Sequence, residues 1–479
     1  MQLRLRPAIF AVGALMLSLL VPAGPAFGQD GQPARPRVLY ISSEGAETSS
    51  IAMFTVDRQT GALTPLANPL PAGISALGVV VTPDGRFVYV ADTDGNQVLS
   101  YSVGRSGALT KLNEAQADGD PFEMAMAPNG RTLYATVQVT DQVESFSVGT
   151  NGRLTSPASV PSGGTNPRGI AVSPDGRFVY VTNGTRNPAV PGTLVTFAVT
   201  DGGSLSLVQS INIGRFGSGI IISPDGRFLY AESQATNQIH AYQRGADGLL
   251  TELPGSPVAS PNDPEGIIIT PDAGHIYAAA TGENSDGTPG SGPGNVQAFG
   301  VQPGGGLGPA QLFDSGSLPN ALAISPSGRF LYGSNGNSNN IVGFAIGPDG
   351  ALSQLPGPPT SQGIDSPGPE AMAMLPNQGP TARFSINTSK SGTLARFDAT
   401  ASSDPDGRVA RYDWDFGDGT VLPDGGPTPN HSYTRSGTFT VTLTVTDDEG
   451  CSDQQVFTGQ SVLCNGSPAA QTVKTITVR

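Results

Sequence analysis

The sequence predicts an all-β protein: a seven-bladed β-propeller, closed by N- and C-terminal strands in one blade, followed by a smaller all-β module. Three observations support this fold. One hairpin phrase recurs through residues 37–375, its tyrosine returns every 45 to 55 residues, and glycine and proline are abundant. With 64 glycines and 42 prolines among 479 residues, long helices are excluded, because both residue types disfavour helix interiors.

Each copy of the repeat is an apolar run, a turn centred on Pro-Asp-Gly or a close variant, and a second run that contains tyrosine. It reads VVVTPDGRFVYV at 79–90 and IAVSPDGRFVYV at 170–181, with variants at 124–135, 220–231, 267–278 and 322–333. Proline fixes φ and glycine accepts positive φ, so each copy is expected to form a β-hairpin. A second hairpin with its own aromatic residue follows, which gives the four strands and the period of a propeller blade.

The hairpin tyrosine sets the number of blades at seven. These residues are Tyr40, Tyr89, Tyr134, Tyr180, Tyr230, Tyr277 and Tyr332. The chain enters the array at 37–42 without an inner strand before it, and leaves at 368–375 with an inner strand but no second one. We therefore expect the two ends to complete one blade, which removes the edges that an open array would expose.

The repeats resemble a known family over residues 37–375. The PDGRF hairpin with its aromatic second hairpin is similar to the lactonase-type, 6-phosphogluconolactonase-like propellers, and Tyr180–Asn183 spells the signature of the YVTN propellers of surface-layer proteins. The resemblance implies a His–Arg–Glu set around the central channel. Here Arg168 matches, but Gly169 stands where histidine is expected and Gln234 where glutamate is expected.

Composition changes after Met374, and residues 376–380 are interpreted as a linker to a module at 381–479. The module contains WDFGDG at 414–419 and the alternating strand TFTVTLTV at 438–445. These segments resemble a PKD domain, an immunoglobulin-like β-sandwich. The resemblance implies a spacer, or a unit that binds protein or polysaccharide, on an extracellular protein.

Two pairs of residues in this module invite specific predictions. Cys451 and Cys464 are expected to form a disulfide across an unusually long loop, the alternative being two free buried thiols. Asp404 and Asp406, in a Ser-Asp-Pro-Asp-Gly turn, are candidate calcium ligands. The alternative is that both carboxylates cap the turn. Calcium aside, no cofactor is expected.

Residues 1–28 are expected to be a signal peptide cleaved near Gly28. Arg4 and Arg6 precede an apolar run, and Ala26 and Gly28 supply the small residues of a cleavage site. The protein is therefore expected to be secreted or periplasmic, without a membrane span and as a monomer. Its net charge of −14 argues against nucleic acid as a partner.

Aligning the inner strands on the hairpin proline suggests a site in the central channel. The small residues at alternate positions, such as Gly78 and Ala125, are expected to face the axis, with Glu123 as the single charged member. Glu123 is a candidate base, and Arg168 a candidate electrophile, for lactone hydrolysis. At the channel mouth, ligand-binding candidates are Glu265, Asn320 and Glu370.

Three functions follow from these features. The first is non-catalytic extracellular binding or adhesion, with a polysaccharide or protein ligand at the propeller mouth, because the expected histidine and glutamate are missing. The second is a lactonase-type hydrolase that uses Glu123 and Arg168. The third is a structural component of the cell envelope.

Overall fold

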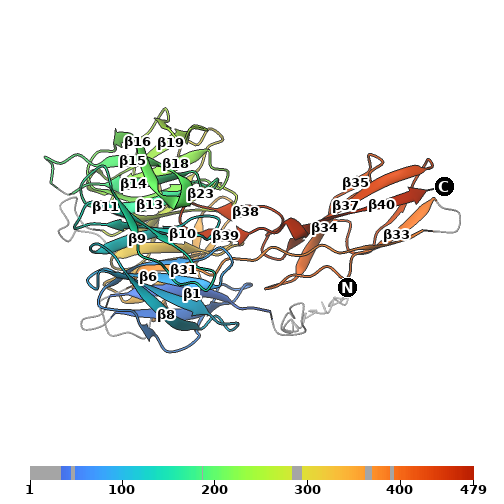
Figure 1. The fold of residues 1–479 in the computed structure, drawn as a ribbon, viewed down its shortest axis with the longest axis horizontal. Helices are drawn as coiled ribbons and strands as arrows, with labels where there is room; N and C mark the ends of the chain where they lie inside the picture. The colour runs from blue at the N-terminus through green and yellow to red at the C-terminus, as the bar shows by residue number, and fades with distance from the viewer. Residues whose placement is uncertain are drawn as a thin grey trace, which may run out of the picture.

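The computed structural model describes residues 34–44, 49–185, 187–282, 294–361, 369–388 and 393–478. The predicted signal peptide, 1–28, lies outside these residues. Figure 1 shows a propeller joined to an elongated sandwich. Within the described part of the chain, no helix is long and apolar enough to cross a bilayer.

Seven antiparallel sheets form the propeller, as the repeat predicts. Blade 2 contains β5 (Ala76–Val81), β6 (Phe87–Asp92), β7 (Gln97–Val103) and β8 (Leu109–Gln116). Blade 3 contains β9 (Pro121–Met126), β10 (Thr132–Val137), β11 (Gln142–Ser147) and β12 (Ala158–Pro161). Blade 4 contains β13 (Pro167–Val172), β14 (Phe178–Asn183), β15 (Thr193–Val199) and β16 (Leu205–Asn212), with the short helix η1 (Asp201–Gly203) between the last two.

The next three blades repeat this order. Blade 5 contains β17 (Gly217–Ile222), β18 (Phe228–Ser233), β19 (Gln238–Arg244), β20 (Leu250–Glu252) and β21 (Val258–Ala259), with η2 (Gln234–Thr236) after β18. Blade 6 contains β22 (Pro264–Ile269), β23 (His275–Ala280), β24 (Asn295–Gly300) and β25 (Gln311–Asp314). Blade 7 contains β26 (Pro319–Ile324), β27 (Phe330–Asn335), β28 (Asn340–Ile346), β29 (Leu352–Gln354) and β30 (Thr360–Ser361).

Blade 1 is built from both ends of the propeller, which confirms the predicted closure. Its inner strand is β31 (Pro369–Met374), followed by β1 (Arg37–Ser43), β2 (Ser50–Val56), β3 (Leu63–Pro65) and β4 (Leu70–Pro71). Leu39 pairs with Met374 and Ser42 with Ala371 in the antiparallel register of β1 and β31. The ring therefore ends without an unpaired inner strand.

The repeated tyrosine fastens each blade to the next. In six of the seven copies its hydroxyl donates to a glycine carbonyl in a turn of the following blade, at 2.8–3.0 Å. Tyr332 of blade 7 bonds Gly61 of blade 1 in this way and so links the last blade to the first. Gly61 has a φ of +73°, and a Cβ there would lie 2.6 Å from the Phe330 ring. Only glycine meets both demands of this joint.

The C-terminal module is a β-sandwich. One sheet contains β32 (Ser385–Thr388), β33 (Leu394–Asp398) and β36 (Asn430–Ser432). The other contains β35 (Val421–Leu422), β34 (Val409–Asp415), β37 (Gly437–Asp447) and β40 (Gln471–Val478), with η3 (Pro468–Ala470) before β40. Trp414 is buried between the sheets against Phe384 and Phe397, and its indole NH donates to the Gly426 carbonyl. The alternating strand around 438–445 supplies one face of this core, as predicted.

A third element of this module reaches into the propeller (Figure 1). It is the hairpin of β38 (Gln455–Phe457) and β39 (Val462–Asn465), here called the channel hairpin, residues 451–465. Its tip bonds two inner strands: Val172 N donates to Gly459 O at 2.8 Å and Ile222 N to Thr458 O at 3.0 Å. The predicted Cys451–Cys464 disulfide is present, with a Cα–Cα distance of 5.4 Å.

Arg37 makes a second connection between the propeller and the sandwich. Its side chain is only 1% exposed, and it donates to Leu375 O, Asn377 Oδ1, Asp406 Oδ2 and Glu449 Oε2. Removing either buried carboxylate would leave much of this guanidinium charge uncompensated. The first residues of β1 are therefore part of the joint as well as of blade 1.

Candidate functional site

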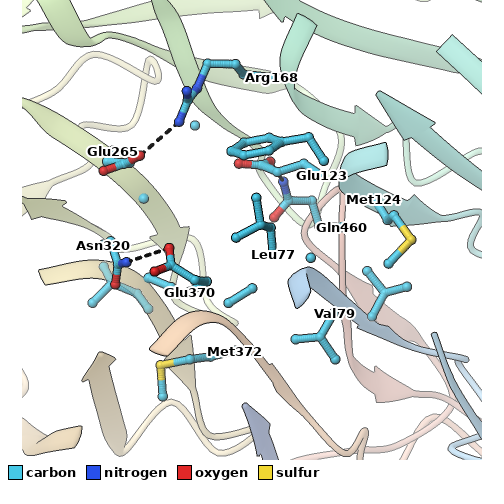
Figure 2. Close-up of a pocket in the computed structure, with 18 of the residues that line it drawn as sticks. Leu77, Val79, Glu123, Met124, Arg168, Glu265, Asn320, Glu370, Met372 and Gln460 are labelled. Atoms are coloured by element: carbon cyan, nitrogen blue, oxygen red, sulfur yellow. Dashed lines mark hydrogen bonds and ion pairs between the residues drawn. The ribbon is translucent and has the colours of Figure 1, made fainter. Parts of the chain in front are cut away.

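The axial channel holds a cavity of about 340 Å³ near the N-terminal ends of the inner strands (Figure 2). Its wall combines polar groups with aliphatic side chains such as Leu77, Val79 and Met372. The five channel residues singled out in the sequence all line it: Glu123, Arg168, Glu265, Asn320 and Glu370. The structure thus brings into one cavity residues that are spread over five blades.

A repeated β-bulge explains why neighbouring residues share this cavity. Every inner strand shifts register against its partner, as between Ala76 and Gly78 or between Pro264 and Gly266. A bulge bends the strand and redirects its side chains. Consecutive residues such as Phe122 and Glu123 therefore both reach the channel.

The small alternate residues such as Gly78 and Gly266 line the cavity, as expected, but a side chain at these positions would meet the next blade. A Cβ on Gly78 would lie 2.5 Å from the Phe122 backbone oxygen, and one on Gly266 would lie 2.6 Å from that of Asn320. These positions point at the next blade, where inner strands converge too closely for a side chain. The intervening series, including Val79, Met124 and Met372, lines the channel as well and supplies side chains to it (Figure 2).

Arg168 is held at the mouth by three contacts. Its Nη2 lies 2.9 Å from Glu265 Oε1, and its guanidinium carbon lies 4.7 Å from the ring centres of both Phe122 and Phe216. Stacking on aromatic faces and pairing with a carboxylate both favour a fixed, charged guanidinium. Arg168 is therefore paired with Glu265, while its charge also acts through space to lower the pKa of Glu123.

Glu123 and Glu370 lie in environments that favour their protonated forms. Burial raises the pKa of Glu123, and Glu265 adds to this, whereas Arg168 and a hydrogen bond from Gln460 oppose it. Burial also raises the pKa of Glu370 to about 8, with repulsion from Glu265 and Glu44. Asn320 Nδ2 donates to Glu370 Oε2 at 3.0 Å, which fixes that carboxyl at the rim.

Glu232 is a buried carboxyl beside Gly219, a residue that lines the cavity, and the sequence did not lead us to predict it. It is fully buried on β18, its Oε2 lies 3.4 Å from Ser218 Oγ, and its Oε1 has no hydrogen-bond partner among the described residues. Burial, with repulsion from Glu265 and Glu123, raises its pKa well above the usual range. One signal could have found it. Two residues after the hairpin tyrosine the other copies have serine, threonine or alanine, and only this copy has a charge.

The candidate calcium ligands lie at the joint between the modules, away from the cavity. Asp406 accepts from Arg37, while both oxygens of Asp404 lack a partner among the described residues although the residue is only 3% exposed. Burial, with repulsion from Asp406 and Asp447, raises the pKa of Asp404 to about 8. No cluster of three or more His, Cys, Asp or Glu suited to a metal occurs in the described ranges. The unpartnered Asp404 oxygens fit a cation, so calcium stays a prediction.

Two family models match the chain. The model described as "Lactonase, 7-bladed beta-propeller" matches residues 34–124, 116–191 and 156–263, and the PKD domain model matches residues 377–461. The fold and the site together define the class of this protein: a seven-bladed propeller with a polar cavity on its axis. The chain belongs to the lactonase-type seven-bladed propellers and carries a C-terminal PKD domain.

Solved structures share the propeller fold. A putative 6-phosphogluconolactonase of Bacteroides uniformis is 20% identical with a TM-score of 0.61, covering 71% of this chain and 99% of its own. The periplasmic gluconolactonase PpgL of Pseudomonas aeruginosa is 18% identical with a TM-score of 0.57, with the same coverage. At these identities the likeness establishes the fold alone.

Curated relatives match part of the chain only. The pre-pro-metalloprotease PrtV of Vibrio cholerae is 39% identical over 94 residues, which is 20% of this chain and 10% of the relative. Collagenase ColA of Clostridium perfringens is 46% identical over 54 residues, or 11% and 5% of the two chains. The chain thus spans a tenth or less of these relatives' lengths.

Proposed function

We propose that this is an exported binding protein whose axial cavity takes a sugar unit rich in hydrogen-bond donors, as at the end of a polysaccharide. The observation that carries the proposal is the charge of the cavity. Of the described residues that line it, Glu44, Glu123, Glu265 and Glu370 carry carboxyl groups, and Arg168 alone carries a guanidinium. Because Arg168 is already paired with Glu265, the wall offers mainly acceptors to a ligand.

This charge balance selects among sugars. An anionic ligand such as a sugar phosphate would meet carboxyl groups at close range, two of which, those of Glu123 and Glu370, already resist ionisation because they are buried. Like charges facing each other cost several kcal/mol at an interface. Hydroxyl or ammonium groups would instead donate to these carboxylates. The substrate class named for the putative 6-phosphogluconolactonases therefore suits this cavity less well than a neutral or amine-bearing sugar.

Calorimetric titration with D-glucosamine, D-glucose and D-glucuronate tests this proposal. We expect saturable binding in the order glucosamine, glucose, glucuronate, and a loss of about tenfold for glucosamine in Glu265→Gln, since one charge-assisted hydrogen bond contributes about 1.4 kcal/mol or more. Glutamine keeps the size of the side chain and can still accept from Arg168. Equal affinities for all three sugars, or no binding together with no response on a glycan array, would contradict the proposal.

A specific observation favours lactone hydrolysis as a second candidate. Glu123, whose pKa is raised by burial, shares one cavity with the guanidinium of Arg168. A carboxyl with a raised pKa suits general base catalysis near neutral pH, and a guanidinium can stabilise an oxyanion. Turnover of a lactone panel in a pH-stat, lost in Glu123→Gln, would favour this candidate. A purely structural role in the envelope predicts neither binding nor turnover.

A further inference from the structure

The floor of the cavity comes from the C-terminal domain. Gln460 and Ser461, at the tip of the channel hairpin, line the cavity together with residues of the propeller. Phe457 and Val462 anchor the hairpin in the core between blades 3 and 4, and Leu463 packs in the core between blades 6 and 7. The hairpin therefore occupies the channel across its width, and the cavity above it is bounded by both domains.

The side-chain amide of Gln460 has a fixed orientation. Its Nε2 donates to the Ile170 carbonyl at 3.0 Å and to Glu123 Oε2 at 3.1 Å. Both partners are oxygen atoms, so the amide must present its NH₂ group to them. The flipped amide would place its oxygen against the oxygens of Ile170 and Glu123. Figure 2 shows the amide nitrogen directed at Glu123. The amide oxygen is thus the group of Gln460 left for a ligand.

We propose that Gln460 is a positioning residue of the propeller's binding site, supplied by the C-terminal domain, which holds the Glu123 carboxylate and presents its own Oε1 to the ligand. The proposal rests on the proposed binding function of the cavity. It makes the two domains one functional unit, since the propeller alone would leave Glu123 without this donor and the channel without this floor.

The surroundings of Glu123 explain why one donor matters. Besides Gln460, the charged groups that act on it are Arg168 and Glu265 at the mouth, and Glu232 repels it from blade 5. Burial and the two neighbouring carboxyls favour the protonated acid, which would donate a proton instead of accepting one. Hydrogen bonds from Gln460 and from the Ile170 backbone N–H stabilise the ionised form. Of these two donors Gln460 is the side chain, so it is the one through which the C-terminal domain favours Glu123 as an acceptor for an incoming ammonium or hydroxyl group.

The titration of Glu123 tests this role without any ligand. The full-length protein, labelled with ¹³C at the glutamate carboxyls, is titrated by NMR, and the Glu123 resonance is assigned from its loss in Glu123→Gln. We expect Gln460→Ala to move the Glu123 midpoint upward by about one pH unit, as removal of one donor to a carboxylate does. The matched control is Gln455→Ala on the same hairpin, whose amide donates to Pro128 O and Asn465 Oδ1, two residues that do not line the cavity.

Binding of D-glucosamine provides the second readout. We expect Gln460→Ala to weaken glucosamine binding by about tenfold and Gln455→Ala to leave the affinity within about twofold of the wild type. Of these two glutamines only Gln460 lines the cavity. An unchanged Glu123 midpoint in Gln460→Ala, or equal shifts in both variants, would overturn the proposal. If wild-type protein binds no sugar while the midpoint moves only in Gln460→Ala, the proposed function fails and the positioning role stands.

Discussion

Arg168 and Glu265 form an ion pair of 2.9 Å across the channel mouth, and blade 5 lies between the blades that supply them. The two residues are 97 positions apart, yet each lies near the start of an inner strand. Arg168 is the one positively charged residue among the described residues that line the cavity, and this pairing uses its charge to compensate that of Glu265. The carboxyls of Glu123 and Glu370 in the cavity, and that of Glu232 nearby, are left in surroundings where burial disfavours ionisation.

Stability should therefore fall as pH rises from about 4.5 to 8. Burial raises the pKa of Glu370 to about 8 in the folded protein, whereas the unfolded chain has a pKa of about 4.3. The stabilisation associated with the protonated Glu370 side chain is therefore fully present below a pH of about 4.3. It is lost as the pH rises through about 8. In Glu370→Gln we expect the decrease in unfolding free energy between pH 5 and pH 8 to shrink by about 1–2 kcal/mol. Urea denaturation at the two pH values measures it.

Glu114 provides the control for this prediction. Its side chain is 52% exposed on β8 and pairs with Lys111 on the surface. Glu114→Gln should leave the difference between pH 5 and pH 8 as in the wild type, because surface ion pairs contribute little. If Glu370→Gln behaves like this control, the carboxyl of Glu370 ionises normally and the account of the cavity is wrong.

The tyrosine joint predicts a defined loss of stability. Tyr332→Phe removes the hydroxyl that bonds Gly61 between the last and first blades but keeps the buried ring. We expect a loss of about 1–2 kcal/mol, since the Gly61 carbonyl is left without this donor. Tyr412 lies in the sandwich, outside the blade joints, so Tyr412→Phe is the comparison. Guanidinium denaturation that gives equal values for both variants would argue against a role for the joint.

Much of the fold could be predicted from the sequence, because the repeat shows the same local chemistry in every blade. The Pro-Asp-Gly turn fixes each hairpin, and the missing strand before residue 37 is explained by the extra strand at 369–374. The direction of the small inner residues could not be predicted. It depends on a bulge and on how closely Gly78 approaches the next blade, and both are properties of the assembled ring.

The site was predicted only in part for the same reason. Aligning the inner strands finds Arg168, Glu265 and Glu370, because equivalent positions converge at one end of a ring. Glu232 was passed over because it stands two residues before Gln234, the position at which the resemblance places the glutamate. Its carboxyl is buried beside Ser218 and Gly219. Gln460 carries no repeat signal at all. The unusual length between the cysteines marked its hairpin as a departure, but its insertion into the channel is a long-range contact.

Calcium is expected to stabilise the joint between the domains. Both oxygens of Asp404 are buried without a partner among the described residues, beside Asp406 and Asp447. A bound cation would compensate this charge, so we expect millimolar CaCl₂ to raise Tm by several degrees at pH 8. Asp404→Asn should abolish the response, and magnesium should produce less of it, because Mg²⁺ demands a stricter geometry. Equal Tm values with and without calcium would show that Asp404 is kept neutral by protonation instead.

The Cys451–Cys464 disulfide should govern how firmly the channel hairpin is held. It links cysteines 13 positions apart and closes a loop that contains β38 and the tip, and such a loop is worth about 3 kcal/mol through the entropy of the unfolded chain. In Cys451→Ala/Cys464→Ala we expect that loss in unfolding free energy and faster proteolytic cleavage within 452–463. The backbone bonds of the tip to Val172 and Ile222 persist in this variant, so the cavity floor should still form. Two results would show that the disulfide does not act locally on the hairpin. One is cleavage of the variant at its rate of global unfolding. The other is a variant whose unfolding free energy and cleavage rate both equal those of the wild type.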